Sequence, residues 1–129
     1  MRALIAALIV AAPALAETPV TPEAFLDAVA GRTVTFVIPE TGQIVGAERF
    51  IDRRRTVWTR ANGDCAHGEV RAVGDEICCR YEDRPNVDWC WVPFEAEGAL
   101  HYRATDTGEV QRVTDMRDSL LGCDGEPMS

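Results

Sequence analysis

The sequence contains no lysine and very little serine, and both shortages narrow the chemistry that the chain can perform. All thirteen basic residues are arginine, and twenty-one acidic residues outweigh them to give a formal net charge of −8. A nucleic-acid partner is therefore not expected, because phosphate binding draws on a cationic face. The only serines, Ser119 and Ser129, stand in no Gly-x-Ser-x-Gly motif, so the usual frame of a serine hydrolase is missing.

Long apolar runs are missing too, except for a short one at the amino terminus. Arg2, the apolar run Ala3–Ala12 and the small-x-small ending Ala14-Leu15-Ala16 together predict a secretory signal peptide, cleaved after Ala16. The run is too short for a permanent membrane span, which needs about 20 residues. We therefore expect a signal peptide over 1–16 and a single domain over 17–129 that is periplasmic or secreted and has no membrane span.

Cysteine is plentiful, and it is concentrated in the middle of the chain. Five cysteines in an exported protein predict disulfides with one thiol left over. The stretch Glu76–Phe94, EICCRYEDRPNVDWCWVPF, holds three of them and two of the three tryptophans. We interpret it as a disulfide-stapled β-hairpin.

The distribution of side chains over the two faces of this hairpin favours one of the possible cysteine pairings. If Cys78 lies opposite Cys90, one face becomes continuously apolar and Arg80 meets Asp88 across the strands. A slip by one residue, joining Cys79 to Cys90, would mix polar and aromatic side chains on one face. The predicted bridges are therefore Cys78–Cys90 and Cys65–Cys123, with Cys79 as a buried free thiol.

The remaining pattern predicts a mainly β fold with one short helix near the amino terminus. Thr21 as N-cap, Pro22 at the first helical position and Gly31 as the stop delimit the helix. From Arg32 onward apolar residues recur with period two, and turn residues interrupt them at short intervals. This pattern predicts an antiparallel meander of about eight strands, which could stay a twisted open sheet or close into an up-and-down barrel. The predicted strands begin near Thr33, Ile44, Thr56, Cys65, Glu76, Val87, Leu100 and Glu109.

No catalytic or metal-binding motif stands out in this framework. Cys65, His67 and the adjacent Cys78 and Cys79 do not have zinc spacing, and oxidised cysteines cannot supply the thiolates that a metal needs. A nucleophile built from Cys79 and either histidine is weak, because burial suppresses ionisation of a thiol. We expect no metal, no cofactor and no enzymatic activity.

Two charged groups are candidate binding surfaces. A basic turn could hold an anionic envelope component through bidentate contacts, and one face of the strand after Asn62-Gly63 carries alternating charged residues. The simpler interpretation of both is a solvated surface. The residues of these two groups are Arg53, Arg54 and Arg55, and His67, Glu69 and Arg71.

Aromatic residues at alternate strand positions have two interpretations. They could form a platform on which sugars stack, but aromatics at such positions more often belong to the core. We expect these aromatic side chains to belong to the core, and we expect the disulfide-bonded central hairpin to have a structural role. The residues concerned are Trp58, Tyr81, Trp89, Trp91 and Tyr102.

A short pattern of residues resembles that of a group of small exported bacterial proteins with a domain of unknown function. The pattern is a helix ending in Gly31-Arg32-Thr33, an aromatic pair Phe50 and Trp58, then Ile77-Cys78-x-x-Tyr81 and Cys90-Trp91. In that group an aromatic residue follows the first hairpin cysteine, so Cys79 departs from the pattern. The resemblance implies a β-rich exported domain and no established activity.

These features together favour a non-enzymatic binding or interaction module, a class that includes inhibitor-like proteins, that acts on a protein or envelope component. Such a function is common among compact, disulfide-bonded, exported β-domains. The first alternative is a calycin-like carrier of a small apolar ligand, which requires a closed barrel with an unfilled interior. The second is a hydrolase with an unrecognised site.

Overall fold

The computed structural model describes residues 9, 16–118 and 123. Apart from Ile9 and Ala16, the predicted signal peptide lies outside the described residues. Residues 119–122 and 124–129, on either side of the predicted bridge cysteine Cys123, also lie outside them.

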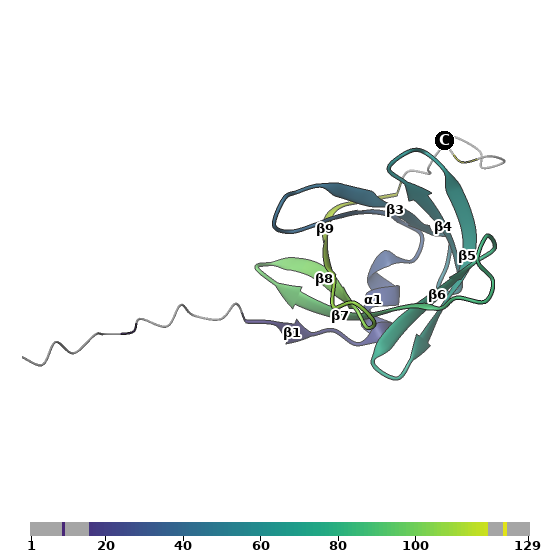
Figure 1. Ribbon diagram of the computed structural model, residues 1–129. Coiled ribbons are helices and arrows are strands. Elements are labelled where there is room, and N and C mark those ends of the chain that lie inside the picture. Colours follow the sequence, from purple (N-terminus) through teal and green to yellow (C-terminus); the bar gives the residue numbers. More distant parts are fainter. Residues whose placement is uncertain (1–8, 10–15, 119–122, 124–129) are drawn as a thin grey trace, which may run out of the picture.

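The strands close into an antiparallel barrel (Figure 1). Each strand from β2 to β9 pairs with the next along the chain, and β9 pairs back to β2, so the ring has no gap. The predicted meander is thus confirmed in its closed form. Its strands are β2 (Thr33–Val37), β3 (Ile44–Phe50), β4 (Arg55–Arg60), β5 (Cys65–Val73), β6 (Glu76–Tyr81), β7 (Trp89–Ala96), β8 (Ala99–Ala104) and β9 (Val110–Arg117).

Alternation along each strand decides which side chains enter the barrel. In β3, Gly46, Glu48 and Phe50 are buried, whereas the residues between them are partly exposed. The same parity buries Ala66 and Val70 of β5. Side chains of a strand point to opposite faces in turn, so these residues face the lumen and their neighbours face outward.

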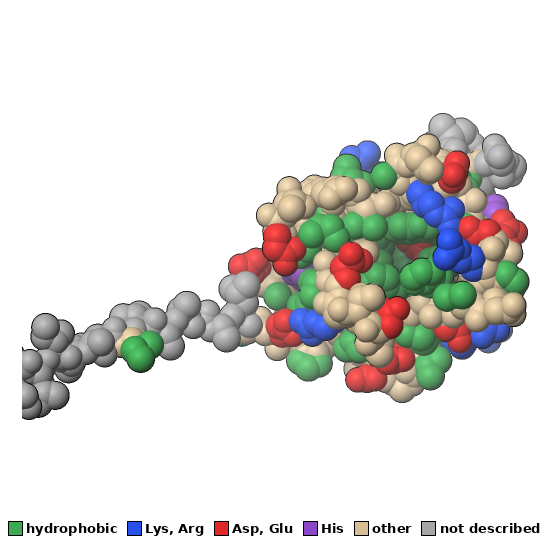
Figure 2. Space-filling model, in the orientation of Figure 1, with side chains coloured by type: hydrophobic (Ala, Val, Ile, Leu, Met, Phe, Trp, Pro, Cys, Tyr) green, Lys and Arg blue, Asp and Glu red, His purple; other side chains and the backbone are tan. Residues whose placement is uncertain are grey.

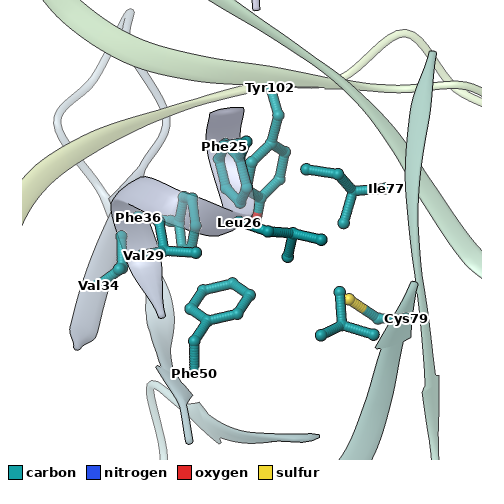
Figure 3. Close-up of a cluster of buried hydrophobic side chains, with 10 residues drawn as sticks. Phe25, Leu26, Val29, Val34, Phe36, Phe50, Ile77, Cys79 and Tyr102 are labelled. Atoms are coloured by element: carbon teal, nitrogen blue, oxygen red, sulfur yellow. The ribbon is translucent and has the colours of Figure 1, made fainter. Parts of the chain in front are cut away.

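The helix α1 (Pro22–Val29) fills one end of the barrel. Its predicted cap is confirmed, because the Thr21 hydroxyl accepts a hydrogen bond from Ala24 N over 3.1 Å. Phe25, Leu26 and Val29 are almost completely buried and point into the core among Phe36, Phe50, Ile77, Cys79 and Tyr102 (Figure 3). The helix therefore plugs the barrel from within, as its ribbon inside the ring of strands shows (Figure 1).

A short strand that the sequence does not predict, β1 (Thr18–Pro19), joins the barrel from outside. Thr18 pairs with Glu95 and Pro19 with Phe94 of β7. The β6 partner of β7 reaches only residues 89–91, so β1 takes up an edge that β6 leaves open. Two residues, one of them proline, carry no periodic signal, and for this reason the pattern did not reveal the strand.

The central hairpin has the predicted register. Cys78 lies opposite Cys90 with their Cα atoms 4.1 Å apart, and the two sulfurs are bonded. Cys65 and Cys123 form the second bridge, and Cys79 is a buried free thiol. One detail differs: the strand expected to begin near Val87 begins at Trp89, so Val87 lies in the preceding loop and is 39% exposed.

The described part of the chain contains no helix with the length and apolar character needed to cross a bilayer.

Candidate functional site

The end of the barrel opposite α1 is hollow. The cavity there has a volume of about 300 Å³; Phe25 of the helix lies among its lining residues, and the loop residues Asp83 and Arg84 lie at its rim. The hollow is visible between the strands, with hydrophobic side chains around it and basic side chains on one side of its rim (Figure 2). The interior of this barrel is therefore only partly filled by its own side chains.

Aromatic rings form a large part of the wall of the cavity. Trp91 and Tyr102 pack edge to face with their ring centroids 4.3 Å apart, and Phe36 lies between Tyr102 and Trp58 at 4.4 and 6.5 Å. The residues that sequence analysis assigns to the core thus also line an open space. The aromatic residues of the lining are Phe25, Phe50, Trp58, Tyr81, Trp89, Trp91 and Tyr102.

Two glycines that face the lumen give these rings their positions. A methyl group at position 46 would lie 2.6 Å from Trp58 Cζ2, and one at position 68 would lie 2.7 Å from Tyr81 Cδ1. Both distances are far inside van der Waals contact. Gly46 and Gly68 therefore allow the rings of Trp58 and Tyr81 to lie against the barrel wall instead of projecting into the cavity.

Glu48 is the one acidic side chain of the described lining that is almost completely buried, at 3% exposure. Its Oε1 accepts a hydrogen bond from the Tyr81 hydroxyl over 2.7 Å, whereas its Oε2 has no hydrogen-bond partner. Burial raises the pKa of Glu48 to about 7, against the opposing effects of Tyr81 and the nearby Thr56 hydroxyl. This carboxyl is therefore close to half ionised at neutral pH.

The groups around Glu48 are held in their neutral forms. Burial raises the pKa of the Cys79 thiol, and the negative charge of Glu48 raises it further. The same two influences raise the pKa of Tyr81 and Tyr102. Cys79 Sγ lies 4.0 Å from Glu48 Oε1, so the thiol is a neutral neighbour of the carboxyl and not an activated nucleophile.

Gln111, from β9, supplies a second buried polar group to the lining. Its Nε2 donates to Glu109 Oε2 over 2.9 Å, and its Oε1 has no partner. The carboxylate of Glu109 can only accept, so this bond fixes which end of the amide points to Glu109. The Gln111 carbonyl oxygen is therefore a buried acceptor without a donor.

Charged residues surround the opening. Arg60, at the end of β4, pairs with Asp83 of the hairpin loop over 2.8 Å, and Arg84 lies beside them in the lining. The pair is about 40% exposed on each side, so water screens it strongly. It links β4 to the hairpin loop at the rim.

In the basic turn predicted as a binding surface, the side chains of Arg53 and Arg55 are engaged in internal contacts. The Arg53 guanidinium pairs with Asp27 of the helix. Asp52 accepts hydrogen bonds from the backbone N–H groups of Arg54 and Arg55, each at 2.8 Å, and also pairs with the Arg55 side chain. The turn is thus built around Asp52, and it does not lie in the lining of the cavity.

The second predicted surface lies on the outer face of β5. Glu69 is exposed, and Arg71 pairs with Asp88, which is also bound by Arg80. The hydrogen bonds from Arg80 and Arg71 lower the pKa of Asp88 to about 2. His67 lies in a separate polar depression beside the Cys65–Cys123 bridge, so these residues do not converge on the cavity.

Neither histidine lies in the described lining of the main cavity. His101 is buried, stacks on Phe94 and has its Nδ1 2.9 Å from the Ala99 carbonyl oxygen. Glu76, Cys78 and Cys90 bring three potential metal-ligand atoms within 4.8 Å of one another, but the two sulfurs are joined in a disulfide. This cluster therefore lacks the thiolates that would bind a metal.

Neither Glu48 nor Gln111 is among the site residues predicted from the sequence. A signal for Glu48 was present, because it has the same parity as Phe50 on the strand Ile44–Phe50 and so had to face inward. The chain gave no match to any protein-family model, curated protein or solved structure in the three comparisons made.

Proposed function

We propose that this protein is an exported, non-enzymatic carrier that holds one small molecule with an apolar or aromatic body inside its barrel. The observation that carries this proposal is the partly unfilled interior. One end is plugged by α1, and the other leaves a cavity of about 300 Å³. Eight-stranded barrels are just wide enough either to be filled by side chains or to hold one small ligand.

The chemistry of the lining supports binding more than catalysis. Ligand sites are typically concave, mostly apolar and equipped with a few polar groups that orient the ligand. Here seven aromatic residues surround Glu48 and Gln111. The cavity thiol, Cys79, is buried with a raised pKa, which makes it a poor nucleophile.

Export is supported by the redox state of the cysteines and by the predicted signal peptide. Two disulfides are expected in a periplasmic or secreted protein and rare in the cytoplasm. A protein or envelope partner for the outer surface stays a prediction. So does the resemblance to small exported bacterial proteins.

Binding is tested with neutral probes of suitable size. Isothermal titration calorimetry of residues 17–129 with 2-naphthylmethanol, 1-decanol and 1-aminoanthracene should detect at least one of them at one site per chain. The Cys79→Phe variant places a large ring in the cavity and should weaken binding about tenfold or more, whereas Cys79→Ser should not. Absence of binding by all three probes, or equal binding to Cys79→Phe folded as judged by circular dichroism, would overturn the proposal.

A further inference from the structure

Two buried acceptor oxygens in this cavity have no donor, and both point to the same class of ligand. They are Glu48 Oε2, on β3, and Gln111 Oε1, on β9. Both side chains belong to the lining and are at most 4% exposed. A buried acceptor without a donor destabilises the folded state, more so when it is charged, so such groups are rare in folded proteins.

The nearby donors of the protein are already used. The Tyr81 hydroxyl donates to the other oxygen of Glu48, and the Thr56 hydroxyl donates to the Arg49 carbonyl oxygen over 3.0 Å. The Gln111 amide nitrogen donates to Glu109. Donors for the two orphaned oxygens can therefore be supplied by a molecule that enters the cavity, water included.

The charge of the Glu48 carboxylate favours a cationic donor group on the ligand over a neutral or anionic one. A carboxylate inside a barrel of low dielectric constant attracts a cation strongly, because no cationic side chain of the described residues bonds it. Ring faces of tryptophan and tyrosine also attract ammonium groups. Trp58, Trp91 and Tyr102 supply such rings in the same lining. An anionic head group would instead face an unpaired carboxylate.

We infer that the ligand of this cavity is a small aromatic or apolar primary amine, bound as its ammonium ion, with N–H groups that donate to Glu48 and Gln111. This inference rests on the proposed function, since it names the chemistry of the molecule that the barrel holds. Arg60 and Asp83 at the rim remain paired with each other and leave the interior carboxylate as the cation-binding group.

Binding of the ammonium ion is coupled to ionisation of Glu48. In the ligand-free protein its pKa is about 7, so at pH 6 the carboxyl is mostly protonated. An ammonium ion requires the carboxylate, and the displaced proton passes to the buffer. The titratable and charged groups that face Glu48 or share its cavity are Cys79, Tyr81, Tyr102, Arg60, Asp83, Arg84 and Glu109.

The test compares two probes of nearly equal shape, 2-naphthylmethylamine and 2-naphthylmethanol, by isothermal titration calorimetry at pH 8. The amine should bind about tenfold or more tightly than the alcohol, because a hydrogen bond to a charged group contributes more than a neutral one. At pH 6, titration of the amine in two buffers of different ionisation enthalpy should show release of about one proton per site, and titration of the alcohol none.

Glu48→Gln keeps the shape of the side chain and removes its charge, so it should abolish both the preference for the amine and the proton release. Glu69→Gln makes the same change on the exposed face of β5 and should alter neither. The proton release is measured on the unchanged protein, so the test does not depend on the folding of Glu48→Gln. Equal affinities for amine and alcohol, or a preference that persists in Glu48→Gln, would overturn the inference and leave the carrier function standing. Failure of both probes to bind would count against the carrier function itself.

Discussion

The Tyr81 hydroxyl donates to Glu48 Oε1 over 2.7 Å, across the interior of the barrel. The two residues belong to β6 and β3, which are separated in the sheet by β5 and β4. Their bond therefore spans the lumen and does not follow the wall. It fixes one oxygen of a buried carboxyl and leaves the other without a donor, and several consequences of this arrangement can be measured.

The first consequence is a dependence of stability on pH. Glu48 has a pKa of about 7 in the folded protein, raised by burial from an ordinary value of 4.5. Between these two values the folded state holds a proton that the unfolded chain has lost, so the contribution of Glu48 to stability falls as pH rises from about 4.5 to 7. The full loss is about 3 kcal/mol above pH 7.

Glu48→Gln removes this titration and should make the protein more stable than the wild type at pH 8, with little difference at pH 4.5. Urea unfolding at both pH values gives the comparison, and taking variant minus wild type cancels the other titrating groups. Glu69→Gln, on the outer face of β5, serves as the control and should show no such pH-dependent difference. If the difference in unfolding free energy between Glu48→Gln and wild type stayed constant across this pH range, Glu48 would not be a buried carboxyl with a raised pKa.

The second prediction concerns Tyr81, whose hydroxyl donates to Glu48. Tyr81→Phe removes the hydroxyl donor of Glu48 Oε1 and leaves it only the weak thiol donor of Cys79, 4.0 Å away, so it should destabilise the fold by about 1–3 kcal/mol at pH 8, where the carboxylate is ionised. The loss should be smaller at pH 5, where the carboxyl is protonated. Tyr102→Phe is the matched control, because the structure describes no hydrogen bond from the Tyr102 hydroxyl. Equal losses for the two variants at both pH values would show that the bond to Glu48 does not contribute.

The third prediction concerns the glycines beneath the rings. Gly68→Ala places a methyl group 2.7 Å from both the Arg80 carbonyl oxygen and Tyr81 Cδ1, so the strand or the ring must shift. We expect a loss of about 1–3 kcal/mol in urea unfolding, together with weaker binding of 2-naphthylmethanol as the Tyr81 ring moves into the cavity. Glu69→Ala, at the neighbouring outward position, should change binding little. Unchanged stability of Gly68→Ala would mean that the ring and strand adjust freely.

The meander could be predicted from sequence because its signals are local. Period-two alternation and turn residues locate the strands, and the faces of Glu76–Phe94 determine a register that the structure repeats. Whether the sheet closes depends on pairing of β2 with β9, residues about 80 positions apart, and no local pattern reports such a pairing.

The cavity could not be predicted for a related reason. Alternation shows that Trp58, Tyr81 and Trp91 face inward, but it does not show whether their rings meet at the centre. That outcome depends on the depth of α1 inside the barrel and on the space that Gly46 and Gly68 give to the rings. The same parity places Glu48 inside, yet only the three-dimensional arrangement shows that one of its oxygens lacks a donor.

The fourth prediction compares the two disulfides. The Cys65–Cys123 bridge joins residues 58 positions apart, and the Cys78–Cys90 bridge joins residues 12 apart. In the chain-entropy model the long loop contributes about 4 kcal/mol and the short one about 3 kcal/mol. Replacing both cysteines of each pair by alanine and unfolding in urea should therefore destabilise the Cys65/Cys123 variant more. The opposite order would indicate that the hairpin staple also holds the aromatic wall of the cavity in place.

The fifth prediction concerns Cys79, which is unpaired although it directly follows the disulfide-bonded Cys78. The thiol is 6% exposed, and both burial and the charge of Glu48 raise its pKa, so the reactive thiolate is scarce in the folded protein. Iodoacetamide should modify Cys79 only after unfolding in urea without reductant, and mass mapping should then place the label on this cysteine alone. Labelling of the native protein would instead mean that the barrel opens on the timescale of the reaction. Any slow labelling of the native protein should become slower still with bound 2-naphthylmethanol, because the probe occupies the space that the reagent must enter. A label found on Cys78 or Cys90 would contradict the hairpin register.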